Sequence, residues 1–415
     1  MNVALFLSRK LSLRQTDHTT SPGVIIAVTG IAISLIIMMV SIATITGFKH
    51  DITVKLLGFN APVSISAIDY SYTDAPTYPG ITLTDSLRIE ISRIVPQAKP
   101  AVTITVPAIF KTDNAFLGIA LKGLSEKEQW DFTAKNLEEG SLPDSDNINE
   151  GIIISRIMAD ALDLQVNDRI LTHFLINNKV KTRKYTVTGI YNSNFSDYDR
   201  SYAFIDIHPL QQLMRLNHLT GSNIELLGIT LDDVPETAET LYSELLSQSI
   251  NNNSTTIRQV TTVYNNASNF FNWLELLDTN VWVILILMAC VSSFTLISSL
   301  FIIMLQRVNT IGLLKALGAA DRMIRNTFIF MAMKIVAKGL IIGNITGISM
   351  LLLQSYLKII PLDAATYYLN YVPININWSI ILILNIAVIL VSWLILILPS
   401  HFVSRISPAK AINYE

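Results

Sequence analysis

Four long stretches of this 415-residue sequence are apolar and contain no Asp, Glu, Lys or Arg. They limit the possible folds more than any other feature, and they are residues 24–48, 279–306, 339–357 and 378–398. An α-helix needs about 20 predominantly apolar residues to cross the core of a bilayer. We therefore predict four transmembrane helices, at residues 22–48, 279–306, 323–357 and 378–399. A secretory signal peptide is the alternative for the first stretch, but its apolar run exceeds the length typical of such a segment.

Composition indicates that only part of the chain lies in lipid. Hydrophobic residues make up 51% of the chain and charged residues 15%, against about 25% charged in soluble domains, so the whole chain is too apolar for one soluble domain. Its 30 Lys or Arg and 32 Asp or Glu are nevertheless too many for a chain that lies wholly in lipid. Most of the charges fall in residues 49–278, so we expect a folded domain there, between helices 1 and 2. The single cysteine, Cys290, excludes an internal disulfide framework. The predicted fold is an α-helical membrane protein with four transmembrane helices and a large extracytoplasmic α+β domain.

The distribution of basic residues predicts the orientation in the membrane. Residues 1–21, 307–338 and 400–415 together contain 11 Lys or Arg and 3 Asp or Glu, whereas residues 49–278 contain 18 and 28. Loops that face the cytoplasm are enriched in Lys and Arg. We therefore expect an amphipathic N-terminal segment (residues 1–21) and a C-terminal tail (residues 400–415) in the cytoplasm. The domain at residues 49–278 and the loop at residues 358–377 would face outward.

Sequence patterns predict the elements of this outer domain. Alternating apolar residues indicate strands at residues 63–67, 101–110, 115–121 and 224–231. Thr84 can cap a helix that carries Leu87, Ile91 and Ile94 on one face, and a second helix is predicted at residues 237–246. Between these passages we expect a β-rich insertion at about residues 140–222, and surface loops at residues 71–77 and 251–256. The insertion would contain strands at residues 152–154, 169–175, 184–191 and 202–205 and a helix at residues 156–164.

The sequence offers little chemistry for catalysis. Its six histidines form no H-E-x-x-H motif, and the chain has no G-x-S-x-G motif. Asp197, Asp199 and Asp206 are too few for a calcium loop, so we interpret them as a solvated acidic loop. We predict no catalytic residue, no cofactor-binding residue, no metal site and no nucleic-acid partner.

A short segment between the second and third apolar runs differs from an ordinary loop. Ile311, Leu314 and Leu317 recur at helical spacing and predict an amphipathic helix, and Gly318 is placed to end it in a left-handed conformation. Such a helix either lies on lipid headgroups or packs its apolar face into a groove of a cytosolic partner. Physical reasoning alone does not decide between these two interpretations.

The same segment carries a resemblance to a known family. It reads Thr310-Ile311-Gly312-Leu313-Leu314-Lys315-Ala316-Leu317-Gly318-Ala319, followed by Ile324-Arg325 and Phe328, and it resembles the signature of FtsX-like ABC-transporter permeases. Further matches are similar to the lipoprotein-releasing (Lol-type) branch of that family. They are Gly47-Phe48, Phe271-Asn272-Trp273-Leu274, Pro361-Leu362-Asp363, Tyr367-Tyr368, Val372-Pro373 and residues 406–412.

The resemblance implies a function as well as a fold. It implies a permease subunit of an ATP-driven complex in the bacterial inner membrane, with a MacB-type periplasmic core. Residues 310–318, within a coupling segment at residues 307–322, would dock on a separate ABC ATPase dimer. This chain has no G-x-x-x-x-G-K-[ST] motif, so the ATPase would be a different chain. The other implied partners are a second permease copy or paralogue, a lipoprotein cargo and a periplasmic carrier.

Two groups of residues in the apolar runs are candidates for this function. Gly339, Gly343 and Gly347 recur every four residues and form a small-residue ridge for close helix contact, either within the subunit or at a moving interface. No acidic or basic residue lies in the middle of a span, which suits acyl chains better than ions. The residues that could line a lipid cavity, or equally face bulk lipid, are Met38, Met39, Ile42, Val283 and Leu287.

Three alternative functions remain open. A MacB-like efflux mechanotransmitter commonly has the ATPase fused to the same chain. An FtsX-like regulator of a cell-wall hydrolase has a much smaller outer domain. A passive membrane scaffold would need no ATPase. In the Lol-type branch one permease carries a long hook that recruits the carrier. The hairpin at residues 174–184 is shorter and lacks a proline-glycine tip, which leaves that recruitment open.

Overall fold

The computed structural model describes residues 22–69, 80–113, 115–143, 151–176, 179–251 and 256–403. The chain forms two compact units. The first, called the sheet unit, consists of Asp51–Asn272 and Leu362–Asn370, and the second, called the helical unit, contains the rest. Five predicted features lie wholly or mostly outside the described residues, namely the N-terminal segment 1–21, the loops at 71–77 and 251–256, the C-terminal tail 400–415 and the motif at 406–412.

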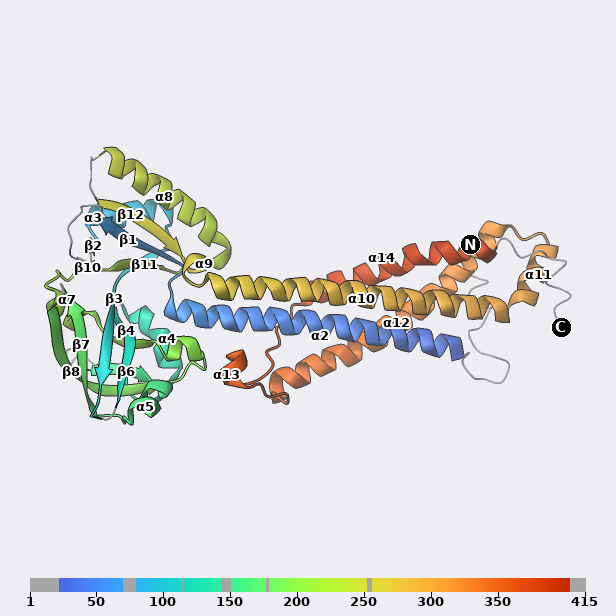
Figure 1. Ribbon diagram of the computed structural model, residues 1–415. Coiled ribbons are helices and arrows are strands. Elements are labelled where there is room, and N and C mark those ends of the chain that lie inside the picture. The colour runs from blue at the N-terminus through green and yellow to red at the C-terminus, as the bar shows by residue number, and fades with distance from the viewer. Residues whose placement is uncertain are drawn as a thin grey trace. The chain divides into compact units, whose positions relative to one another are not determined.

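Four of the described helices are long and apolar enough to cross a membrane. Figure 1 labels them α2, α10, α12 and α14, and the short helix α11 lies between α10 and α12 in the sequence. Their bounds are α2 (Pro22–Phe59), α10 (Ser268–Gln306), α11 (Val308–Ala316), α12 (Asp321–Leu357) and α14 (Trp378–Val403).

Helices α2 and α10 are longer than the predicted spans. Helix α2 continues past residue 48 because Ile52, Leu56 and Phe59 lie on one face and are each at most 1% exposed. Helix α10 already begins at Ser268, before the predicted residue 279. The uncharged runs therefore mark the apolar parts of these helices, and the helices themselves extend into the sheet unit.

A reciprocal side-chain bridge joins α12 and α14 inside the helical unit. The amide nitrogen of Asn344 donates to Oδ1 of Asn385 at 2.7 Å, and Nδ2 of Asn385 donates to Oδ1 of Asn344 at 3.0 Å. Each amide also donates to the backbone carbonyl four residues earlier in its own helix. All donors of these two amides are thereby paired in an apolar setting, where an unpaired polar group is costly.

One sheet of ten strands organises the sheet unit. Its main path is β12-β1-β11-β3-β4-β9-β6-β8-β5, with β7 paired to both β3 and β8, while β2 and β10 form a separate pair. The bounds are β1 (Val63–Asp69), β2 (Ile81–Thr82), β3 (Lys99–Lys111), β4 (Phe116–Leu124), β5 (Leu137–Gly140), β6 (Gly151–Ser155), β7 (Arg169–Ile176), β8 (Lys179–Tyr191), β9 (Tyr202–Asp206), β10 (Thr220–Gly221), β11 (Asn223–Leu227) and β12 (Thr256–Thr262).

The long strand β3 belongs to two substructures. One edge of β3 pairs with β11 over Lys99 to Thr103 and with β7 over Ala108 to Lys111, and Pro107 lies in the unpaired stretch between them. The other edge pairs with β4. The pairings β3-β4-β9-β6-β8-β7-β3 therefore close a ring of strands, a small barrel. Alternate residues such as Phe110, Phe174 and Val187 are fully buried, as in the interior of a barrel.

The shorter helices pack around this sheet. The cap at Thr84 is confirmed, because its side chain accepts a hydrogen bond from the Leu87 amide, and Leu87 and Ile91 are buried. The helix predicted at residues 156–164 ends earlier, because Asp163 adopts a left-handed conformation. The bounds are α3 (Asp85–Ile94), η1 (Lys127–Trp130), α4 (Asp131–Lys135), α5 (Arg156–Leu162), α6 (Ser196–Asp199), α7 (Ile207–Met214), η2 (Leu231–Asp233), α8 (Val234–Asn251), α9 (Val263–Asn266) and α13 (Ala364–Tyr367).

The predicted strands of this unit are confirmed, and in three of them one end differs by three or more residues. The strand predicted at residues 115–121 continues to Leu124. The strand predicted at residues 224–231 ends at Leu227, because Gly228 has a φ of +83° and the chain turns there. The strand predicted at residues 184–191 begins earlier, at Lys179, since it forms the second arm of a hairpin with β7. The polar residues Lys181 to Lys184 gave no alternating pattern from which this extension could be predicted.

Candidate functional site

Helix α11 has a well-defined C-terminal end. Gly318 has a φ of +85°, and the Gly318 and Ala319 amides donate to the carbonyls of Lys315 and Leu314 at 3.0 Å each. This is the pattern of a Schellman motif, so the predicted stop at Gly318 is confirmed. The ammonium of Lys315 lies 3.0 Å from the carboxylate of Asp321, the first residue of α12. The turn between α11 and α12 is thus held by backbone and side-chain contacts.

The faces of α11 differ from the sequence prediction. Ile311 is 1% exposed and belongs to the same buried cluster as Ile324 and Phe328 of α12, and Leu314 packs against that cluster. Ile311, Leu314 and Leu317 therefore do not form one free apolar face. That prediction is wrong because the helix packs on its own subunit along the Ile311 side.

The exposed stripe of α11 consists of other residues. Leu313 is 59% exposed and Leu317 is 76% exposed. Asn309 and Ala316 are also exposed, and the spacing of these four residues places them on one side of the helix. Thr310 and Lys315 are half-buried, and Gly312 is buried. Of residues 310–318, the structure leaves Leu313, Ala316, Leu317 and Gly318 available for contact.

The glycine ridge of α12 packs on α2. A Cβ atom added to Gly339 would lie 2.8 Å from Cβ of Ile31, and one added to Gly343 would lie 3.1 Å from the carbonyl oxygen of Ala32. A Cβ atom at Gly347 would meet Sδ of Met39 at 3.3 Å. All three glycines are buried, so the ridge lets the two backbones approach within the subunit.

An apolar pocket of about 220 Å³ lies among α2, α10 and α14. Met38 lines it, whereas Met39 and Ile42 line a second, much smaller pocket next to α14. Val283 and Leu287 line neither of these two pockets, and their side chains are 58% and 52% exposed. Of the five candidate residues for a lipid cavity, these two pockets therefore divide Met38 from Met39 and Ile42. The first pocket is lined by Met38, Trp282, Leu285, Ile286, Ala289, Ser292, Ser293, Leu384, Ala387, Val388, Val391 and Ser392.

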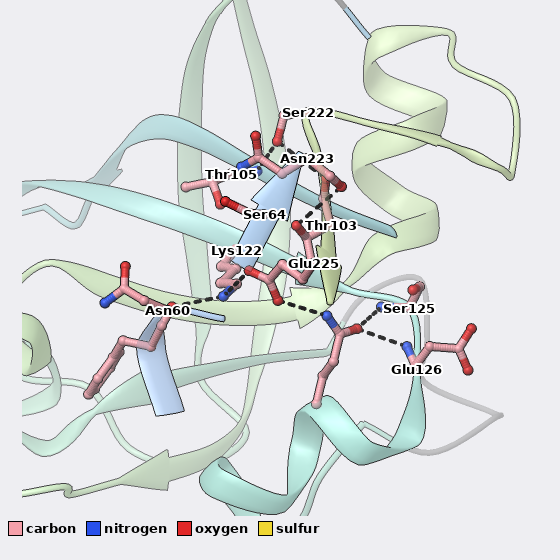
Figure 2. Close-up of polar contacts among 12 residues, drawn as sticks. Asn60, Ser64, Thr103, Thr105, Lys122, Ser125, Glu126, Ser222, Asn223 and Glu225 are labelled. Carbon is pink, nitrogen blue, oxygen red and sulfur yellow. Dashed lines mark hydrogen bonds and ion pairs between the residues drawn. The ribbon is translucent and has the colours of Figure 1, made fainter. Parts of the chain in front are cut away.

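A buried polar cluster lies where α2 ends in the sheet unit. Figure 2 shows Lys122 of β4 pointing toward Glu225 of β11, with their charged atoms 2.7 Å apart and their side chains only 6% and 10% exposed. The Lys122 ammonium also donates to the carbonyl oxygen of Phe59 at 2.8 Å. Gln129 of η1 donates to Glu225 at 3.0 Å and accepts from two backbone amides, those of Ser125 and Glu126. A lysine thus neutralises the negative end of helix α2 inside the protein.

An aromatic cluster surrounds the same helix end. Phe59 lies 4.8 Å from Tyr198, measured between ring centroids, and 4.9 Å from Phe132. Phe195 stacks on Tyr198 at 4.9 Å. Phe59 and Phe195 are at most 1% exposed, so these rings form the apolar contact between α2 and the turn α6. The further members of this cluster are Tyr191, Tyr202, Phe204, Phe270 and Tyr368.

The interpretation of three aspartates as a solvated acidic loop is wrong. Asp199 is 1% exposed, and its carboxylate accepts hydrogen bonds from the hydroxyl of Ser193 at 2.6 Å and from the amides of Ser193 and Phe195. Burial raises the pKa of Asp199 to about 6, and these three hydrogen bonds act in the opposite direction. Asp206 caps α7 through the His208 amide, and Asp197 is the exposed one of the three, with its carboxylate accepting a hydrogen bond from the Tyr368 hydroxyl at 2.9 Å. Asp199 thus fixes the α6 turn and Asp206 the start of α7, and the three aspartates form no metal-binding group among the described residues.

Sequence reasoning missed Lys122, Glu225 and the aromatic cluster. Lys122 is the one charged residue within the apolar strand Phe116–Leu124, and Glu225 is the one charged residue within Asn223–Leu227. A single charge inside each of two buried strands was a usable signal for a pair. The spacing of Tyr191, Phe195 and Tyr198 gave no comparable signal, because aromatic residues are also common in ordinary strands.

These arrangements join a helix end to two strands and leave one apolar surface exposed. The described residues contain no cluster of three or more His, Cys, Asp or Glu that could hold a metal ion. Lys122 and Glu225 are paired and lie inside the sheet unit, where they join a helix end to two strands. The exposed stripe of α11 offers a contact surface just before α12 begins.

Two family models match the chain and together span most of it. The MacB-like periplasmic core domain matches residues 24–241. The FtsX-like permease C-terminal model matches residues 282–408, the region that contains α11, α12 and α14. The first match therefore begins in α2 and contains the barrel, and the second contains the exposed stripe of α11.

Curated relatives match over nearly their whole length. The lipoprotein-releasing system transmembrane protein LolC of Xylella fastidiosa is 20% identical, with 94% of this chain and 93% of that protein covered. LolC of Neisseria meningitidis serogroup B is 22% identical, with 98% of each chain covered. LolE of Haemophilus influenzae, named a transmembrane protein of the same system, is 22% identical, with 92% of each chain covered.

Solved structures give a weaker likeness. The periplasmic region of MacB from Actinobacillus actinomycetemcomitans is 13% identical, with 53% of this chain and 96% of that chain covered, at a TM-score of 0.32. The extracellular domain of the transporter YknZ from Gram-positive bacteria is 12% identical, with 48% and 100% covered, also at 0.32. These scores are too low to support an argument. On the sequence matches, the chain belongs to the family with a MacB-like periplasmic core domain, is an FtsX-like ABC-transporter permease, and is similar to the LolC and LolE transmembrane proteins.

Proposed function

We propose that this chain is the permease subunit of an ATP-driven complex that extracts lipoproteins from the outer leaflet of the bacterial inner membrane. The complex passes them to a periplasmic carrier by mechanotransmission, and a separate ABC ATPase dimer supplies the energy. The names of the full-length relatives support the cargo class. The observation that carries the proposal is the stripe of α11, on which Leu313 and Leu317 are exposed while the opposite side is buried in the subunit.

In this proposal the ATPase is held on the permease because it buries the exposed leucines of the stripe. An exposed leucine that becomes buried at an interface contributes about 1.5–3 kcal/mol. Leu313 and Leu317 are both more than half exposed, so together they supply about 3 kcal/mol, or roughly a hundredfold in Kd. Because the Schellman motif and the Lys315–Asp321 pair fix α11 to α12, movement of a docked ATPase passes directly into α12.

The route for the cargo is proposed beside α10. Only 11% of the apolar window of this helix is buried in the single chain, and Trp282, Val283 and Leu287 are exposed. We place a second permease copy or paralogue against this surface, so that acyl chains enter between the two subunits. Such a cavity would contain Val283 and Leu287 together with the pocket that Met38 lines. It has no buried charge among its described residues, which suits an acyl chain.

The hairpin of β7 and β8 is the proposed contact for the carrier. Residues 169–184 contain five Lys or Arg and no Asp or Glu, although the sheet unit as a whole is acidic. Leu175 and Val180 are 60% and 69% exposed and lie opposite each other in the hairpin. An apolar strip with a basic border favours a partner whose contact surface is apolar and acidic. The tip residues 177–178 lie outside the described residues.

Docking of the ATPase is the first test of this function. The tagged chain is purified together with its associated proteins, and the same is done for the variant Leu313→Ser/Leu317→Ser. We expect the ATPase to accompany the original chain and to be largely missing from the purified variant. The control is Leu305→Ser, which replaces a leucine of α10 that is 71% exposed and lies outside the stripe.

Two outcomes would contradict the proposal. An original chain that is recovered intact without an ATPase would be no subunit of such a complex. The stripe would be excluded as the docking surface if the double variant retained as much ATPase as the Leu305→Ser control does.

Depletion of the chain tests the cargo, because lipoproteins should then accumulate in the inner membrane. Increased sensitivity to exported compounds without that accumulation would favour the MacB-like efflux function.

A further inference from the structure

Segments connected to all four long helices meet at the short turn α6. Phe59, the last residue of α2, packs on Tyr198 of this turn with ring centroids 4.8 Å apart. Phe270, near the start of α10, packs on Phe195 at 4.9 Å. Tyr368, in the segment that joins α12 to α14, packs on Phe195 at 4.8 Å. Phe195 and the turn α6 therefore make ring contacts with α2, with α10 and with the segment that joins α12 to α14.

The third of these connections is a compact strap, Leu362–Asn370, which belongs to the sheet unit. Its two ends are tied together, because the Leu362 amide donates to the Asn370 carbonyl at 3.0 Å. Just outside the strap, Pro361 and Tyr371 form an antiparallel bridge. The strap is joined to α12 through residues 358–361 and to α14 through residues 371–377, so it is continuous in the chain with both helices.

Tyr368 holds the strap in place through three kinds of contact. Its hydroxyl donates to the carboxylate of Asp197 at 2.9 Å, and its ring lies against both Phe195 and Phe270. Its carbonyl oxygen accepts a hydrogen bond from the Lys55 ammonium of α2 at 2.5 Å. A further hydrogen bond to the strap, from the Ser196 hydroxyl to the Ala365 carbonyl, is long at 3.5 Å.

The backbone of Tyr368 is strained in this position. Its φ is +61°, a left-handed conformation that bulky side chains rarely adopt. Such a conformation persists where surrounding contacts hold it, and here Tyr368 ends α13, with its amide donating to the Ala364 carbonyl at 3.0 Å, while its side chain contacts the α6 turn and its carbonyl contacts Lys55. After release of the strap the core of the aromatic cluster would remain packed, because Phe59, Phe195 and Tyr198 contact one another directly.

We propose that the strap is a releasable latch, by which α12 and α14 hold the α6 turn in one state of the transport cycle and let it go in another. The route runs from α11 through the adjoining helix α12 to the strap, all within one continuous stretch of chain. A helix of 37 residues is about 55 Å long, so α12 carries a displacement at its first turn over that distance. The source of the movement rests on the proposed ATPase partner, whereas the latch itself rests on the contacts of Tyr368.

A crosslink between Ser196 and Ala365 reports whether the latch is closed. Cys290 is first replaced by alanine, and cysteines are introduced as Ser196→Cys and Ala365→Cys in the complete complex in lipid nanodiscs. A short bifunctional thiol reagent is added without nucleotide and again after trapping with ATP and vanadate. We expect the crosslink yield to fall several-fold in the trapped state. We also expect the crosslinked complex to keep ATP hydrolysis and to release several-fold less lipoprotein.

The outcomes separate failure of the latch from failure of the proposed function. A complex that contains the ATPase and hydrolyses ATP, but gives the same yield in both states and releases lipoprotein when crosslinked, would overturn the latch. A chain that assembles with no ATPase would instead overturn the proposed function.

A second pair of variants covers a failure of the cysteine chain to fold. Tyr368→Ala should lower lipoprotein release several-fold while ATP hydrolysis persists. Tyr367→Ala replaces a neighbouring tyrosine that is 46% exposed, and it should leave release unchanged. Equal release by these two variants would also overturn the latch.

Discussion

Lys122 and Glu225 form a buried ion pair at the end of α2. They lie far apart in the sequence and on strands that are not neighbours, since β3 separates β4 from β11. Register decides that both side chains point to the same face, and register depends on pairings between distant segments. The sequence therefore indicates two unusual charges but not that they meet at the end of α2. The burial of Asp199 was equally hidden, because its partners lie in its own turn and resemble a polar loop.

Removal of one member of this pair is predicted to be far more harmful than removal of both. Glu225→Ala leaves the Lys122 charge buried without its carboxylate, which costs about 3–5 kcal/mol of unfolding free energy. Lys122→Met/Glu225→Leu removes both charges, and it should cost clearly less. Thermal or denaturant unfolding of the full chain in detergent measures these differences.

The control for this prediction is the exposed pair of Arg93 and Glu244, whose side chains are 65% and 41% exposed. Glu244→Ala should change stability by about 1 kcal/mol or less, because exposed ion pairs contribute little. If Glu225→Ala were no more destabilising than Glu244→Ala, the buried pair would not stabilise the end of α2.

At the scale of elements, local patterns predicted most helices and strands and failed where packing decides. Val63–Asp69, Asp85–Ile94 and Tyr202–Asp206 carry clear periodicity and lie where it predicts them. The closed barrel could not be predicted, because it depends on the pairing of β7 with β3, which no local pattern encodes. Helix α11 was predicted with the wrong free side, since its contact with Ile324 and Phe328 is tertiary. Periodicity identifies an apolar face but not what covers it.

The contact between α2 and α12 predicts a graded response to added methyl groups. Gly343→Ala would place a methyl group 3.1 Å from the carbonyl oxygen and 3.2 Å from Cα of Ala32, backbone atoms that cannot move aside. Gly347→Ala meets only the flexible side chains of Met39 and Ile36, the nearest atom at 3.3 Å. We expect Gly343→Ala to destabilise the chain by about 1–3 kcal/mol and Gly347→Ala by clearly less. Thermal unfolding in detergent measures both, and the reverse order would show that the ridge does not set the distance between the helices.

At the scale of the whole molecule, two units with different surfaces share one chain. The helical unit exposes apolar side chains along α10 and α14, as expected for contact with lipid or with another subunit. The sheet unit has its own buried core, which includes the barrel. Three segments connect the units along the chain, namely α2, the start of α10 and the strap Leu362–Asn370. The proposed function requires that work done at α11 reaches the sheet unit, and that it crosses the membrane on the way.

That requirement gives a prediction about topology that does not depend on the identity of the cargo. In a chain with Cys290→Ala, single cysteines are introduced at two exposed positions, Glu236→Cys in α8 and Asn309→Cys in α11. A membrane-impermeant thiol reagent added to cells with a permeabilised outer membrane should label position 236 and should not label position 309. Position 309 should become reactive only after the inner membrane is opened, because the excess of Lys and Arg around α11 favours the cytoplasmic side. Equal labelling of both positions in closed cells would place α11 beyond the reach of any cytoplasmic ATPase, and the docking function of Leu313 and Leu317 would then be excluded.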